Sequence, residues 1–106
     1  MSTATIDRVL VALADPTRRA VLDDLGRRRS SSATELAERL PVSRQAVLKH
    51  LGVLRDARLV SSAKSGREVL FEVRTEQLVQ TAAWMTSLAA AWDDRLGDLK
   101  RRAEAL

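Results

Sequence analysis

The chain contains no cysteine and only one histidine, His50. Without cysteine it can form no disulfide, no thiolate metal site and no thiol redox sensor. A single histidine supplies no His/Cys cluster for a transition metal, and no catalytic set of residues is recognisable. Asp93, Asp94 and Asp98 are expected to form a solvated acidic face rather than a site for a hard cation. We therefore expect no enzymatic activity, no metal and no cofactor.

Long apolar runs and aromatic residues are also scarce. No run approaches the ~20 residues of a membrane span, and residues 1–5 lack the basic and apolar regions of a signal peptide. These absences favour a cytoplasmic protein with no membrane partner. The only aromatic residues are Phe71, Trp84 and Trp92, which argues against single-strand binding by base stacking. The length of 106 residues and a hydrophobic content of 45% suit one globular domain over residues 1–106.

The net charge of +4 lies entirely in one part of the chain. Residues 42–74 hold seven lysines and arginines against three acidic residues, a surplus of four, whereas the remainder holds eleven of each sign. A local positive surplus is what phosphate binding requires.

The segment 41–58 in that basic region has the pattern of a helix with two different faces. Ser43 is suited to cap its N-terminus. Three apolar residues at helical spacing, Val47, Leu51 and Leu54, predict a buried face. The opposite face carries donors and little bulk, which suits a helix that enters a DNA major groove; it comprises Arg44, Gln45, Leu48, Lys49, Gly52 and Arg55. Taken alone, an ordinary amphipathic helix with a solvated face explains the pattern equally well.

The flanking segments favour the DNA-binding interpretation. Residues 32–40 predict a short helix with a capping box between Ser32 and Glu35, and Pro41 then enforces a turn. Residues 32–58 thus form a helix-turn-helix unit. In residues 59–64 and 67–73, apolar and polar side chains tend to alternate, which predicts two strands joined at Ser65-Gly66. This hairpin over residues 59–74 would be a wing with Lys64 and Arg67 at its tip.

These motifs together resemble the ArsR-type winged helix-turn-helix repressors, especially their metal-independent branch. The similar segments are Leu13–Leu22, Ser43–Leu51, Val53–Val60 and Gly66–Glu68. They occur in order, and the resemblance extends over residues 6–106. It implies an α+β, mostly helical winged helix-turn-helix fold and repression of transcription through double-stranded DNA. It also implies that His50 contacts a backbone phosphate, the alternative being a partly buried structural histidine.

The first and last segments predict a dimer interface. A helix over 5–14 is apolar on almost every side. Residues 75–106 predict one long helix, capped by Thr75, whose apolar residues keep an unbroken heptad spacing: Leu78, Ala82, Met85, Ala89, Trp92, Leu96, Leu99, Ala103 and Leu106. A segment of about 45 Å is too long to be buried on so small a domain, so we expect a two-fold homodimer. The alternative is a single core helix. The predicted interface residues are Ile6, Val9, Leu10, Leu13, Met85, Trp92, Leu96 and Leu99.

A second helix is expected from Asp15, as cap, to Gly26, with Ala20, Val21 and Leu25 pointing inward. Arg18 and Arg19 either touch phosphate or pair with a nearby carboxylate, and residues 27–29 are expected to form a solvated loop.

Two residues depart from the family pattern, and a third raises a question about the last helix. Leu48 replaces a small hydroxyl residue on the outward face, where it either contacts a thymine methyl or weakens the hydrogen-bond recognition of bases. Arg58 replaces the glycine that usually ends this helix in a left-handed conformation, so a different helix exit is expected. Gly97 either kinks the last helix or allows two chains to approach closely.

We therefore expect a sequence-specific DNA-binding regulator, a homodimeric repressor of an inverted repeat. The predicted DNA-binding residues are Ser43, Arg44, Gln45, Lys49, His50, Lys64 and Arg67. One alternative is a winged helix that binds proteins, with a merely solvated basic face. The other is a sensor of an unidentified small molecule or ion at the dimer interface, near Trp84, Met85, Leu88 and Trp92.

Overall fold

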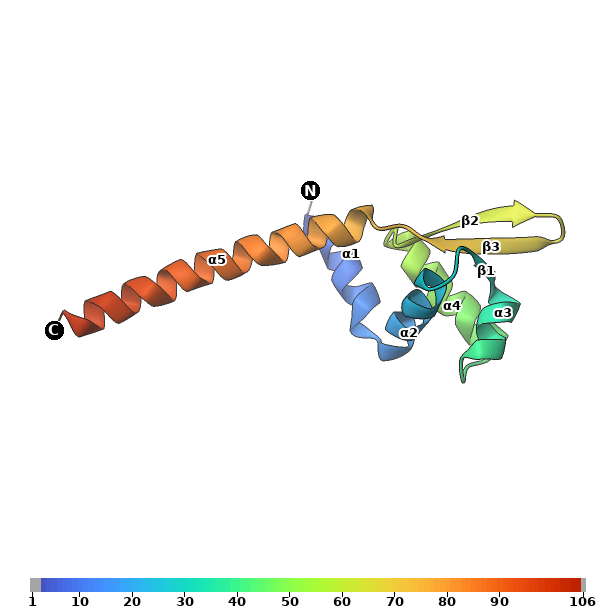
Figure 1. Cartoon of the computed structure of the whole chain (residues 1–106), viewed down its shortest axis with the longest axis horizontal. Coiled ribbons are helices and arrows are strands. Elements are labelled where there is room, and N and C mark those ends of the chain that lie inside the picture. Colours follow the sequence, from blue (N-terminus) through green and yellow to red (C-terminus); the bar gives the residue numbers. More distant parts are fainter. Residues whose placement is uncertain (1–2, 106) are drawn as a thin grey trace.

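A computed structural model describes residues 3–105 of the chain (Figure 1). Within that range, five helices and three short strands make an α+β, mostly helical fold, as the sequence predicts. The elements are α1 Thr3–Ala14, α2 Pro16–Gly26, β1 Ser31–Ser32, α3 Ala33–Arg39, α4 Arg44–Asp56, β2 Val60–Ser65, β3 Glu68–Val73 and α5 Glu76–Glu104. None of the helices in this range is both long and apolar enough to cross a membrane. Met1, Ser2 and the last heptad residue, Leu106, lie outside the described residues.

Helix α2 begins as predicted. The carboxylate of Asp15 caps it by accepting from the backbone N–H groups of Thr17, at 2.8 Å, and Arg18, at 3.0 Å. Val21 and Leu25 are fully buried. The prediction that Ala20 points inward is wrong, because the buried stripe of α2 is narrow and Ala20 is exposed beside it.

The arginines of α2 close the end of α1. Arg18 donates from Nε to the carbonyl of Ala12 at 2.8 Å, and Arg19 donates from Nη1 to the carbonyl of Leu13 at 2.6 Å. The last carbonyls of a helix have no partner within it, so these bonds satisfy groups that would otherwise need water. Arg18 also lies 3.8 Å from the carboxylate of Asp15. Both arginines therefore hold the α1–α2 corner together.

Helix α3 has the predicted capping box. The N–H of Ser32 donates to Glu35 Oε1 at 2.9 Å, and the N–H of Glu35 donates to Ser32 Oγ at 3.1 Å. Arg39 then ties α3 to its neighbours, because it donates to Asp24 Oδ2 and to Ser31 Oγ, each at 2.8 Å. This network fixes α3 against α2 and β1.

Helix α4 buries its predicted face and ends in a way that the sequence did not predict. Val47, Leu51 and Leu54 are at most 1% exposed. Arg58 adopts the left-handed conformation, with φ of 60°, so the expectation of a different exit is wrong. Two backbone bonds hold it there, from Leu59 N–H to Leu54 C=O and from Arg58 N–H to Arg55 C=O, both 2.9 Å. These are the bonds of a Schellman motif, and the burial of Leu59 anchors them.

The hairpin is confirmed, with its turn one residue later than predicted. Strands β2 and β3 pair antiparallel from Val60↔Val73 to Ser65↔Glu68, and Gly66 makes the turn with φ of 62°. Strand β1 adds a third strand on the other side of β3 through the pair Ser31↔Phe71. Strand β1 was not predicted from the sequence, because two serines carry no alternating pattern.

Helix α5 runs without a break through Gly97. It contacts α1 near its start and then extends away from the body of the molecule as an arm (Figure 1). Thr75 stands at the predicted capping position, but its side chain makes no capping hydrogen bond. The longest dimension of the molecule is 70 Å, and this arm accounts for its length.

Candidate nucleic-acid interface

The N-terminal half of α4 carries most of the predicted DNA-binding residues on the side away from the core. Ser43 caps the helix by accepting from the N–H of Ala46 at 3.1 Å, which leaves its own hydroxyl hydrogen free to donate. The side chains of Gln45 and Lys49 are exposed one turn apart. Their spacing places them on one face of the helix, opposite the buried stripe. This face therefore offers both an amide and an ammonium group to a ligand.

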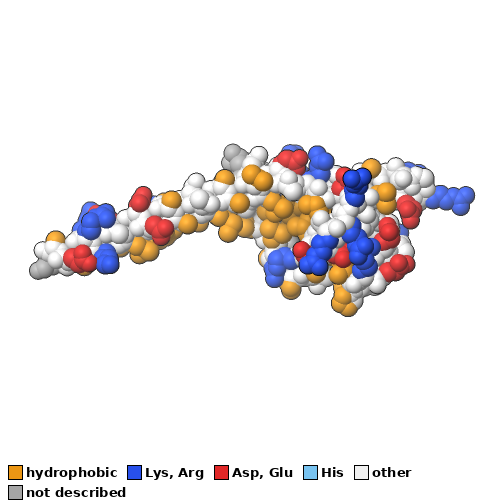
Figure 2. All heavy atoms as spheres, in the orientation of Figure 1, with side chains coloured by type: hydrophobic (Ala, Val, Ile, Leu, Met, Phe, Trp, Pro, Cys, Tyr) orange, Lys and Arg blue, Asp and Glu red, His pale blue; other side chains and the backbone are white. Residues whose placement is uncertain are grey.

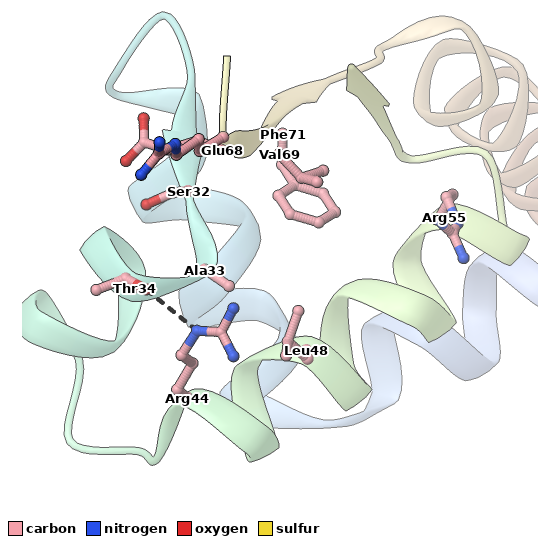
Figure 3. Close-up of a pocket in the computed structure, with 10 residues that line it drawn as sticks. Ser32, Ala33, Thr34, Arg44, Leu48, Arg55, Glu68, Val69 and Phe71 are labelled. Carbon is pink, nitrogen blue, oxygen red and sulfur yellow. Dashed lines mark hydrogen bonds between the residues drawn. The ribbon is translucent and has the colours of Figure 1, made fainter. Parts of the chain in front are cut away.

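Arg44 is held in place by the helix before it. Its Nε donates to Thr34 Oγ1 at 3.1 Å, so α3 fixes the orientation of the guanidinium group. Figure 3 shows the rest of that group turned toward the space between α4 and the wing. A guanidinium fixed at one nitrogen keeps its other donors available for a phosphate or a guanine.

A groove of about 390 Å³ separates α4 from the wing. Figure 3 shows Leu48 and Arg44 on the α4 side and Val69 and Phe71 on the strand side. The groove is lined by Ser32, Ala33, Thr34, Arg44, Leu48, Arg55, Arg67, Glu68, Val69 and Phe71. Arg44 and Arg67, which are far apart in the sequence, thus lie at one groove, while Lys64 is exposed on β2 of the same hairpin.

Arg55 is a third cation at this groove, although it is not among the DNA-binding residues predicted from the sequence. It lies on the same face of α4 as Arg44 and Leu48, three turns after Arg44 and two turns after Leu48. The helical spacing was the signal that could have identified it.

His50 lies on a different side of α4 from Gln45 and Lys49. It is half-buried, and its Nδ1 atom is sealed from solvent without a hydrogen-bond partner among the described residues. It lies within electrostatic range of Asp15, the residue that caps α2. The pKa of Asp15 is lowered mainly by the hydrogen bond from the backbone N–H of Arg18, then by that from Thr17 and by the charges of Arg18 and His50.

The predicted dimer residues fall into two groups. Ile6 and Val9 are 7% and 0% exposed, so the core of the chain itself already covers them, and Leu13 is partly buried against that core. The others keep much of their surface: Leu10, Met85, Trp92, Leu96 and Leu99 are 38–60% exposed. Figure 2 shows apolar side chains gathered over α1 and along one edge of α5. The unpartnered apolar surface is therefore mainly on α5.

No group of three or more acidic or histidine side chains within residues 3–105 is arranged to hold a metal ion. The chemistry of the surface is instead that of a basic helix beside a basic hairpin tip. A short helix, a tight turn, a second helix and a hairpin define a winged helix-turn-helix protein of the kind that binds duplex DNA.

Comparison with known proteins places this chain in a family. A helix-turn-helix domain family model matches residues 13–63. The chain is 42% identical over 86 residues to the HTH-type transcriptional regulator Rv2034 of Mycobacterium tuberculosis, covering 81% of this chain and 77% of that protein. It is 29% identical over 91 residues to the transcriptional repressor SdpR of Bacillus subtilis, covering 86% of this chain and all of that protein.

A solved structure extends the likeness to the whole fold. An ArsR-like transcriptional regulator from Rhodococcus sp. RHA1 is 44% identical, with a TM-score of 0.87 over 97% of this chain and 96% of that one. The chain belongs to the ArsR-type winged helix-turn-helix transcriptional regulators, a family of DNA-binding proteins. The resemblance noted from the sequence motifs is confirmed.

Proposed function

We propose that this DNA-binding regulator is a homodimeric repressor that binds an inverted repeat in duplex DNA. The proposal that it represses transcription draws on the likeness to SdpR, which is named a repressor. The proposal that it reads two half-sites draws on the apolar face that α5 leaves exposed.

The observation that carries the DNA-binding surface is that its cations form almost no ion pairs within the described residues. Within residues 3–105, arginines elsewhere are often neutralised: Arg18, Arg27, Arg39, Arg101 and Arg102 all form ion pairs with aspartates. Among the seven cations of residues 42–74, only Arg74 does so in the described structure, with Glu76. The cations of α4 and the wing therefore remain available to phosphate groups, whose neutralisation drives most DNA affinity.

The roles of individual residues follow from where they lie. Gln45 projects from the outward face and would meet a base edge, where an amide suits adenine. Lys49, one turn further along, would reach a phosphate beside the major groove. Ser43, Arg44 and His50 would contact the backbone beside the major groove. Lys64 and Arg67 on the wing would reach the flanking backbone or minor groove.

Titration of single variants against a duplex recovered by selection tests these roles. Arg67→Ala should weaken binding to all duplexes alike and reduce the salt dependence by about one phosphate contact. Gln45→Ala should weaken the selected duplex more than a scrambled one, because it removes base recognition. Arg27→Ala is the matched control, since Arg27 is the exposed C-cap residue of α2 and does not line the groove. Equal binding by all four proteins would contradict the proposal.

A further inference from the structure

Gly52 lies in the interior of α4, at a position where nothing in the fold requires glycine. A methyl group added at its Cα would meet no atom within 4 Å, and its φ is not in the left-handed region. It stands eight residues into α4, away from either cap. Glycine in the interior of a helix is unfavourable relative to alanine. Glycine therefore destabilises α4 at this position, and no packing contact compensates for that loss of stability.

Two cations are the neighbours of Gly52 on the surface of α4. Gly52 lies seven residues after Gln45, so the two share the outward face. Lys49 lies three residues before it and Arg55 three residues after it, and residues at this spacing are neighbours on a helix. Both cations are exposed, and neither forms an ion pair or hydrogen bond within the described residues. Two cations without ion pairs thus flank an open space beside Gly52.

We propose that a phosphodiester group of the DNA binds against Gly52, where Lys49 and Arg55 hold it. The absence of a side chain lets the phosphate approach the helix backbone closely enough for both cations to reach it. Asp56, four residues beyond Gly52, is the acidic neighbour on the same side, and it marks where the phosphate-binding stretch of α4 ends. The inference rests on the proposed DNA binding, adds Gly52 to the site and gives Arg55 a phosphate to bind.

The decisive variant is Gly52→Ala, because the fold and the DNA respond to it in opposite directions. The added methyl occupies open space, so the midpoint of thermal unfolding should rise by about 4 °C. The same methyl would hold the phosphate away, so affinity for the selected duplex should fall at least tenfold. The slope of log affinity against log salt should become shallower by about 0.9, the equivalent of one phosphate. Gly26→Ala, on the last residue of α2, is the matched control and should leave affinity unchanged.

A double-mutant cycle with Arg55→Ala tests whether the two residues share one phosphate. Each single variant should show the shallower slope, and the double variant should bind no more weakly than the weaker single variant, because the same contact is lost once. Undiminished affinity of Gly52→Ala, or a change in its oligomeric state instead of its affinity, would overturn the inference. If wild type binds the duplex with strong salt dependence, that failure leaves the proposed function intact; if wild type shows no such binding, both fall.

Discussion

Arg58 shows how one residue can be forced into an unfavourable backbone conformation by its neighbours. Its φ of 60° is fixed by the two bonds that end α4 and by the burial of Leu59 immediately after it. A left-handed conformation costs a residue with a Cβ roughly 1–2 kcal/mol. No hydrogen bond or ion pair of the Arg58 side chain within the described structure offsets this cost.

Arg58→Gly should therefore stabilise the protein. We expect the free energy of unfolding to rise by about 1 kcal/mol, since glycine adopts this conformation freely but loses more entropy on folding. Urea unfolding at one fixed protein concentration would measure it. Arg58→Ala is the control, because it removes the side chain and keeps the Cβ, so it should give little gain. Equal stabilisation by both variants would show that the guanidinium, and not the backbone, is responsible.

The helix caps predict a loss of stability in acid. Hydrogen bonds to the folded carboxylates lower two pKa values: that of Asp15, mainly through the N–H of Arg18, and that of Glu35, mainly through the N–H of Ser32. A lowered pKa means that the folded state favours the charged form. Its contribution is therefore complete above the unfolded pKa, near 3.8 for Asp15, and disappears as the pH falls through the lower folded value.

Asp15→Asn should make the stability of the protein fall less steeply as the pH is lowered. Asparagine still accepts the capping hydrogen bonds but does not titrate. Thermal unfolding measured from about pH 6 down to pH 3 should show a smaller decrease for Asp15→Asn than for wild type. Identical curves for the two proteins would rule out the Asp15 cap as a source of acid sensitivity.

At the scale of elements, α5 is the part of the chain that most needs a partner. Met85, Trp92, Leu96 and Leu99 are each more than half exposed on it. Their heptad spacing places them on one face. A helix of 29 residues with such a stripe is stabilised most economically by packing against a second copy of itself.

Leu96→Glu should convert the dimer to a monomer while leaving α1 to α4 folded. The substitution places a charge in the proposed apolar seam, and Leu96 is 57% exposed in the single chain, so its loss removes little of the core. Sedimentation equilibrium would measure the mass, and circular dichroism would check the fold. Arg101→Glu is the matched control, because its heptad position is on the opposite face. A wild-type protein that is itself monomeric, or a Leu96→Glu protein that stays dimeric, would contradict the proposed interface.

The helices and the hairpin could be predicted because their signals are local. Asp15, Ser32 and Ser43 each cap a helix within three residues of their own position, and Val47, Leu51 and Leu54 reveal their burial by spacing alone. The features that the sequence did not reveal depend on contacts between distant segments. Strand β1 exists only because β3 lies beside it, and the bond from Arg44 to Thr34 depends on the angle between α3 and α4.

The candidate site was predicted less completely for the same reason. The spacing of α4 identifies its outward face, but which part of that face adjoins the wing depends on how β3 packs. Arg55 joins Arg44 and Arg67 at one groove only in three dimensions. Likewise, the apolar residues of the first helix divide between core and surface: Val9 is fully buried and Leu10 is 38% exposed. A nearly all-round apolar sequence gives no indication of that division.

At the scale of the whole molecule, the basic surface and the exposed apolar surface lie on different elements. A group of cations without ion pairs belongs to α4 and the wing, and the exposed apolar stripe belongs to the arm formed by α5 (Figures 1 and 2). Two copies joined through α5 would present two basic units related by two-fold symmetry. A symmetric protein of this kind binds symmetric DNA, with half-sites one helical turn or a multiple of it apart.

Selection of binding sites from random duplex DNA, followed by affinity measurements on the recovered sequence at several salt concentrations, tests this account most directly. We predict an inverted repeat, with affinity that falls by about a thousandfold or more between 50 and 200 mM salt if six or more phosphates are contacted. Failure to enrich any sequence, with only weak binding at low salt, would contradict the account and favour a winged helix whose basic face is merely solvated.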